Sequence, residues 1–250
     1  MKKANWMLMF LLPLLIGSGC VIDINDDDSD DDDNFGNCLF GEGDVVTEVL
    51  NIDDFDGIKL MVDADVFITQ GSEQKVEITA EQNIIDEIER DVRNETWEIE
   101  FDRCVIRHDD IQIFIVMENI ELLSISSSGF IRGENNFNVD DIDLRITGSG
   151  DMDLALEATD VDGEITGSGK IFLEGITDDF DIDISGSGDY RAFDLIANRG
   201  DIRITGSGDS EVRVNDELDI RITGSGDVRY KGNPILNVEA SGSGRVIDAN

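Results

Sequence analysis

The sequence is dominated by a short string that recurs at a nearly constant interval. Gly-Ser-Gly begins at residue 148 and returns at 167, 186, 206, 224 and 242, so successive copies are 18 to 20 residues apart. A degenerate copy, Ser-Ser-Gly, begins at residue 127. A fixed period of this length is typical of repeat architectures, in which each unit packs on its neighbours. The chain is therefore restricted to a stack of similar units.

Within the repeats, apolar and polar residues alternate. Ile202, Ile204, Val212 and Val214 share one parity, and charged residues occupy the other. Alternation with period two predicts strands. It continues through Gly-Ser-Gly, which places both glycines on the inward parity and the serine on the outward one. The glycines either permit a positive φ at a corner or leave room where the interior narrows.

A unit of about 19 residues cannot bury its apolar face alone, but a stack of units can. We therefore predict an all-β parallel β-helix, or β-solenoid, with coils of about 19 residues that we expect to be right-handed. Residues 62–68, 97–101 and 111–117 alternate as well and are expected to form earlier, less regular coils. An antiparallel barrel stays open, because Asp162-Gly163 could form a hairpin turn. Helical spacing of isoleucines predicts one short helix near residues 83–93.

The N-terminus indicates export. Two lysines precede an apolar run at residues 6–16, which is too short to span a bilayer and is followed by small residues. Cys20 comes next, and the segment resembles a bacterial lipoprotein signal, although Gly17 stands where that pattern prefers Leu. The resemblance implies lipid modification of Cys20, attachment to a membrane and a bacterial outer-membrane lipoprotein, either periplasmic or surface-exposed. The expected organisation is a signal peptide over 1–19, an acidic tether over 20–44 and a single domain over 45–250.

The charge of the chain excludes one class of partner. Lys+Arg 19 against Asp+Glu 57 gives a net charge of −38, and such a chain repels nucleic acids. Residues 23–33 are mostly aspartate, and adjacent carboxylates keep the chain extended. This run is either a soluble tether or a sorting signal, since it resembles the surface-export signals of lipoproteins in Bacteroidetes-type bacteria.

Two further cysteines could be joined outside the cytoplasm. A bridge between Cys38 and Cys104 would tie the end of the tether to the domain. Two free buried thiols remain the alternative.

Stacked coils would align equivalent residues in columns. The first column is a row of outward hydroxyls, Ser149, Ser168, Ser187, Ser207, Ser225 and Ser243. It could bind a flat polar ligand such as a glycan, or its members could simply bond to one another along the stack. The second column is charged: Asp151, Lys170, Asp189, Asp209, Asp227 and Arg245. The carboxylates of Asp189, Asp209 and Asp227 would turn to water or share a cation, for which calcium is a weak candidate.

Four segments resemble the start of the head GIN domain: FDGIKL at 55–60, DVFITQGS at 65–72, KVEI at 75–78 and NIID at 83–86. This family is described as a putative auto-transporter adhesin of unknown function, and the resemblance covers about residues 45–250. It implies a β-helix, secretion or lipid anchoring and a role in adhesion, and it offers no catalytic residues to transfer. We expect no cofactor, with calcium as the one candidate.

The leading prediction for function is therefore a non-enzymatic envelope lipoprotein that displays a rigid β-helix for adhesion or surface interaction. The alternative is a calcium-dependent glycan-binding or polysaccharide-lyase-like β-helix, with Arg203 or Arg221 beside the column carboxylates. His108 is the only histidine, and no nucleophile motif accompanies it.

Overall fold

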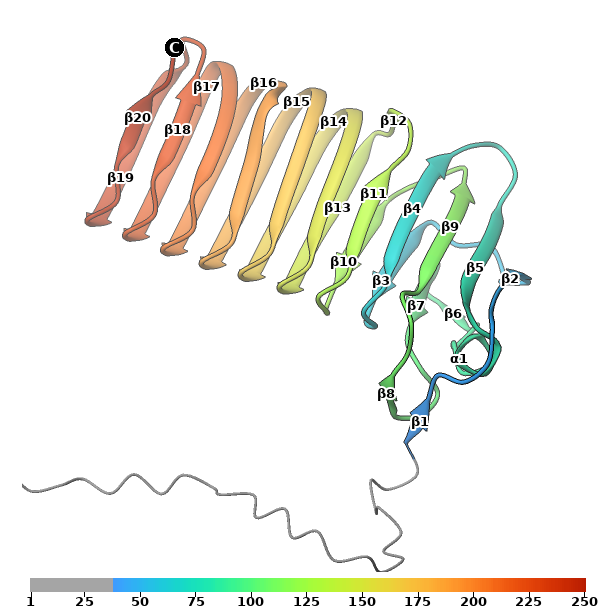
Figure 1. Ribbon diagram of the computed structural model, residues 1–250. Coiled ribbons are helices and arrows are strands. Elements are labelled where there is room, and N and C mark those ends of the chain that lie inside the picture. Colours follow the sequence, from blue (N-terminus) through green and yellow to red (C-terminus); the bar gives the residue numbers. More distant parts are fainter. Residues whose placement is uncertain (1–37) are drawn as a thin grey trace, which may run out of the picture. The chain divides into compact units, whose positions relative to one another are not determined.

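The computed structural model describes residues 38–250, which form a β-solenoid with one short helix (Figure 1). The predicted signal peptide, Cys20 and the acidic run at 23–33 lie outside the described residues. Within residues 38–250, no helix has the length and apolar character that crossing a membrane requires.

Four long strands form the regular part of the stack. They are β14 (Asp151–Gly167), β15 (Lys170–Gly186), β16 (Asp189–Gly206) and β17 (Ser210–Gly224). Each runs from one Gly-Ser-Gly to the next, and neighbours pair in parallel with the repeats aligned. The predicted parallel solenoid is confirmed. The hairpin alternative is wrong, because Asp162 and Gly163 lie inside β14, opposite Asp181 and Ile182 of the next coil.

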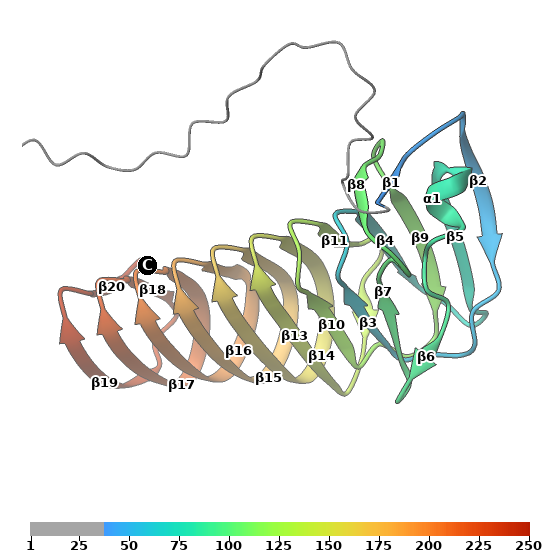
Figure 2. The ribbon, with the colours of Figure 1, turned by 90° about the horizontal axis from the view of Figure 1, so that it is seen from below.

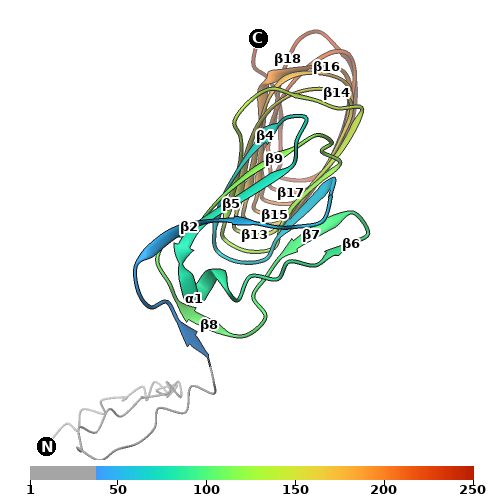
Figure 3. The ribbon, with the colours of Figure 1, turned by 90° about the vertical axis from the view of Figure 1, so that its right-hand side faces the viewer.

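Each coil bends at Gly-Ser-Gly and again near its middle, so the stack has two walls (Figure 3). The second bend lies near Gly175, whose φ is +122°, and the pairing of β15 with β16 shifts register just before it.

We call the wall that leads into Gly-Ser-Gly the aspartate face. It consists of residues 160–167, 179–186, 199–206 and 217–224 with β7 (Thr96–Ile99), β3 (Gly57–Leu60), β10 (Leu122–Ile125), β13 (Asp141–Gly148) and β19 (Ile235–Gly242).

We call the wall that follows Gly-Ser-Gly the aromatic face. It consists of residues 151–156, 170–174, 189–193 and 210–213 with β9 (Gln112–Met117), β4 (Asp65–Gln70), β11 (Phe130–Gly133), β18 (Val228–Lys231) and β20 (Val246–Asp248). The short strand β12 (Phe137–Asn138) pairs with β14 near the middle bend.

The inward residues of both walls fill the interior. Ile165, Ile184, Ile204 and Ile222 form one aligned row, and each is at most 1 % exposed. Burial of a side chain of this size stabilises the fold by roughly 2 kcal/mol. Successive rows repeat this contribution along the stack, which is why the alternation specifies the solenoid.

The two glycines of each repeat differ in backbone conformation. The first, as at Gly206, has a φ of +132°, a conformation that side chains rarely adopt. The second, as at Gly208, has ordinary φ, but a Cβ there would lie 2.1 Å from the carbonyl oxygen of Gly188 in the preceding coil. Both sequence-based explanations therefore apply: the first glycine adopts the positive φ, and neither position has room for a Cβ.

The N-terminal end departs from the repeat. Here β2 (Val45–Leu50) and β5 (Lys75–Glu81) pair antiparallel, as do β5 and β9, so the expected early coils are only partly parallel. The predicted helix at 83–93 is too long, because α1 covers only Gln82–Ile85 and β6 (Val92–Arg93) follows. The chain leaves the helix so that Ile88 can form a bridge with Phe101 and bury its side chain.

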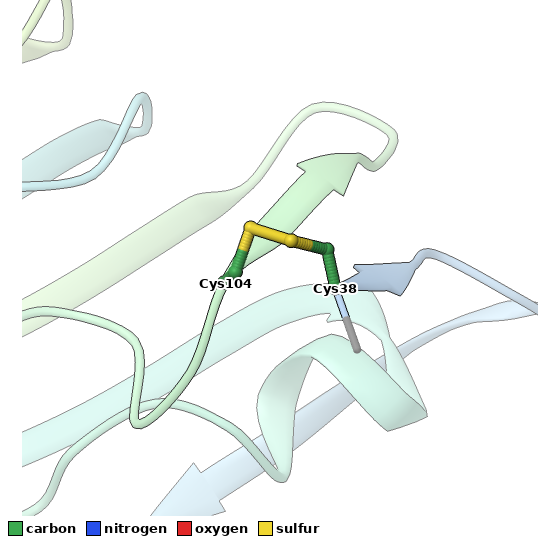
Figure 4. The surroundings of a disulfide bond; sticks show 2 residues. All are labelled: Cys38 and Cys104. Carbon is green, nitrogen blue, oxygen red and sulfur yellow. A yellow bond between two sulfur atoms is a disulfide. The ribbon is translucent and has the colours of Figure 1, made fainter. Parts of the chain in front are cut away.

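A disulfide joins two segments at this end of the chain (Figure 4). Cys38 and Cys104 are joined, and β1 (Leu39–Phe40) pairs with β8 (Val105–Arg107) beside them. Strand structure thus begins before residue 45, where the sequence placed the start of the domain.

Candidate binding surface

The hydroxyl column is present and fully outward. All six serines are exposed, and each donates its backbone N–H to a carbonyl of the preceding coil, as Ser187 does to Gly167 at 2.8 Å. Among residues 38–250, their hydroxyls make no hydrogen bond to another protein group. The backbone supports the stack here, and the hydroxyls are left to solvent or a ligand.

The charged column after Gly-Ser-Gly is held by its own stack. Each carboxylate accepts a hydrogen bond from the backbone N–H of the next member of the column. The distances are 3.2 Å from Asp209 to Asp189, 2.8 Å from Asp227 to Asp209 and 3.0 Å from Arg245 to Asp227. Arginines occupy the remaining oxygens, such as Arg229 on Asp209 at 3.2 Å. These carboxylates therefore have partners without a cation, and residues 38–250 hold no group of three acidic, histidine or cysteine side chains arranged for a metal.

The structure does not bring Arg203 or Arg221 to the carboxylates of Asp189, Asp209 and Asp227. Arg203 and Arg221 lie on the aspartate face, where they pair with Asp183 at 3.0 Å and Glu239 at 3.0 Å. The Asp189 column lies on the other side of the Gly-Ser-Gly corner. His108 directs Nδ1 to the carbonyl oxygen of Asp109 at 2.7 Å and is partly exposed.

The aspartate face carries an acidic column that sequence reasoning missed. Its members are paired coil to coil: Asp143, Asp162, Asp181, Asp201, Asp219 and then Asn237. The sequence contains the pattern that predicts this column, because each of its residues stands five positions before a Gly-Ser-Gly. With the two flanking columns, this face presents twelve carboxylates and four arginines in aligned rows.

The pKa values of individual carboxylates in these rows depend on burial and on the charges beside them. Burial raises the pKa of Asp160, and the neighbouring Asp162, Asp179 and Asp141 raise it further. Where an arginine is close, the direction reverses. The side chain of Arg199 holds the pKa of Asp179 below its usual range.

The aromatic face carries a column of different chemistry, which sequence reasoning also missed. Strand pairing aligns nine outward residues: Phe114, Phe67, Arg132, Asp153, Phe172, Arg191, Glu211, Arg229 and Ile247. We call this set the aromatic column. Eight strand steps of about 4.8 Å give it a length of roughly 38 Å.

The aromatic column alternates exposed rings with ion pairs. Phe114 stacks on Phe67 with ring centroids 5.0 Å apart, and Phe114 is 43 % exposed. Arg132 and Asp153 pair at 3.2 Å, and Phe172 follows with 38 % of its surface exposed.

Beside Phe172 the surface is hollowed. The hollow has a volume of about 390 Å³ and is lined by Phe172, Phe193, Arg191 and several carboxylates, among them Asp153 and Glu211. Lys231 lies over the Phe193 ring, 4.2 Å from its centroid. The arrangement offers apolar ring surface and paired hydrogen-bonding groups along one line.

Comparison with known proteins agrees with this architecture. A family model described as "Putative auto-transporter adhesin, head GIN domain" matches residues 54–234. A search of curated proteins found no match.

Three solved structures share the fold. A putative adhesin from Bacteroides fragilis NCTC 9343 is similar with a TM-score of 0.78 at 22 % identity, over 84 % of this chain and 99 % of that one. A putative lipid binding protein from Parabacteroides distasonis ATCC 8503 has a TM-score of 0.72 at 22 % identity, with the same two coverages. A putative adhesin from Parabacteroides merdae ATCC 43184 has a TM-score of 0.71 at 23 % identity, again with the same coverages. The family model matches most of the chain, and this protein therefore belongs to the head GIN domain family of putative auto-transporter adhesins.

Proposed function

We propose that this protein is a non-enzymatic lipoprotein of the bacterial cell envelope that presents its solenoid for adhesion, and that the aromatic column binds an extended glycan. The aromatic column is the observation that carries the proposal. The family supports a place at the cell surface or in the envelope, and the apolar N-terminal segment followed by Cys20 supports the lipid anchor.

The chemistry of the aromatic column suits a polymeric, hydroxyl-rich ligand. Exposed rings can cover the apolar faces of sugar rings, and guanidinium and carboxylate groups supply donors and acceptors for hydroxyls. The site is a long line with one open hollow, which favours an extended chain over a small molecule. The neighbouring aspartate face would repel acidic polymers, so we expect neutral glycans to bind best.

Glycan-array binding by the full chain tests the proposal. Phe172→Ala removes a central ring and should weaken binding by about tenfold or more, the effect expected for a central aromatic contact. Thr166→Ala, an exposed change on the aspartate face, is the matched control and should leave binding unchanged. Equal binding by both variants would show that the aromatic column is not the site.

Calcium and catalysis are separate arms of the same experiment. We expect binding to persist in EDTA, because the carboxylates of Asp189, Asp209 and Asp227 each already accept hydrogen bonds from a backbone N–H and from a guanidinium group. For Asp227, Arg245 supplies both donors. Binding that is lost in EDTA and restored by calcium would favour the calcium-dependent alternative. Cleavage of an acidic polysaccharide that Arg221→Ala abolishes would favour the lyase-like one.

A further inference from the structure

The two ends of the solenoid differ in how far other elements of the chain cover them. Helix α1 and strand β2 lie over the N-terminal end, whereas β19 and β20 at the other end each pair with a single strand of residues 38–250 (Figures 1 and 2). In β17 the inward residues Leu218 and Ile220 are 0 % and 3 % exposed. Their counterparts one coil later, Leu236 and Val238, are 37 % and 46 % exposed. This end therefore presents the cross-section of the core together with two open strand edges.

The charge of this end also differs from that of the rest of the chain. Residues 228–250 contain three basic residues, Arg229, Lys231 and Arg245, and two acidic ones, Glu239 and Asp248. The chain as a whole carries −38. The repulsion that separates two copies along the acidic faces is thus weak at this end.

We infer that this bare end binds the same end of a second copy, with β19 pairing antiparallel to β19 and β20 to β20 about one two-fold axis. An open edge of unpaired backbone groups is a template for strand addition. Pairing centred on Val238 would set Leu236 opposite Ala240 of the second copy and keep the inward residues of both copies inward. The inference goes beyond the proposed function and does not rest on it.

A second copy fits this end better than an unrelated strand does. The end offers two edges at once, one in each wall, and only a partner with two edges at the same separation completes both. A second copy meets this condition by symmetry. The inward residues of β19 are also complementary to themselves in size, since the large Leu236 meets the small Ala240. In such a pair, the two Cys38 ends lie at opposite extremes, so the dimer can join two anchored molecules that face each other.

Disulfide trapping tests the register. Two residues that face each other across an antiparallel pair have Cα atoms about 4.5–5.5 Å apart, within the range a disulfide spans. Val238→Cys in the full chain should therefore give a reducible dimer under mild oxidation. Thr166→Cys, exposed in the middle of the stack, measures random collision, and the unchanged chain measures cross-linking through the native cysteines. No more dimer from Val238→Cys than from Thr166→Cys would overturn the inference.

Sedimentation of the full chain in mild detergent tests the affinity. The unchanged chain should sediment as a dimer, and Val238→Lys should raise the dissociation constant at least tenfold. Val238 is already half exposed, so the lysine does not disturb the core, and circular dichroism confirms the fold. Thr166→Lys is the control for the added charge. A monomeric unchanged chain, or equal effects of the two lysines, would refute self-association whatever the outcome of the glycan experiment.

Discussion

Replacing the second glycine of one repeat tests how tightly the coils stack. In Gly208→Ala, the new Cβ would lie 2.1 Å from the carbonyl oxygen of Gly188 and 2.7 Å from Cγ2 of Ile184. One of these contacts is to the backbone of the preceding coil rather than to a side chain, so the coils must separate locally. Overpacking typically costs about 1–3 kcal/mol. We place Gly208→Ala at the upper end, about 3 kcal/mol.

The same corner supplies two matched variants. Gly206→Ala meets the carbonyl oxygen of Gly186 at 2.2 Å and must in addition adopt a φ of +132°. Holding a side chain in such a region adds about 1–3 kcal/mol. Ser207→Ala lies between them, exposed and with only its backbone engaged, and should stay within about 0.5 kcal/mol of the unchanged chain.

Urea unfolding followed by circular dichroism measures all three. The midpoint should fall in the order Ser207→Ala, Gly208→Ala, Gly206→Ala, with the first close to the unchanged chain. If Gly208→Ala unfolds within about 0.5 kcal/mol of the unchanged chain, the close approach of successive coils at the corner is refuted.

Two further predictions concern stability. Cys104→Ser opens a loop of 66 residues between Cys38 and Cys104 and should lower the free energy of unfolding by about 4 kcal/mol, measured by urea unfolding against the oxidised chain. Asp160 has a folded-state pKa above its ordinary value, because it is half-buried and close to other carboxylates. Its ionised form therefore opposes folding at neutral pH, and this penalty disappears as the pH falls through the folded-state pKa. Asp160→Asn should raise the free energy of unfolding at pH 7 by up to about 1 kcal/mol, and a gain that persists below the ordinary pKa of aspartate would contradict the electrostatic cause.

The repeats were sufficient to predict the regular half of the fold. Alternation showed that Ile202 and Ile204 point inward, and the period showed which coil each residue lies beside. The Asp143 to Asp219 column followed from the same spacing and could have been found. In a repeat, the neighbour of a residue is its own counterpart, so the sequence alone specifies the pairing.

The tertiary structure decided what the repeat does not specify. Alternation identifies the inward face of a strand but neither its partner nor its direction, and so the antiparallel pairing of β2 with β5 was not predicted. The aromatic column places Phe67 and Phe114, which precede the Gly-Ser-Gly repeats, in line with Phe172 of the repeat region. The exposure of Val238 likewise reflects that no strand of residues 38–250 apart from β17 lies over β19, although its sequence resembles that of the buried strands. The sequence determined how the coils stack, because stacking repeats one local pattern. The N-terminal part of the aromatic column and the two ends of the solenoid came from contacts between unlike segments, which no local pattern contains.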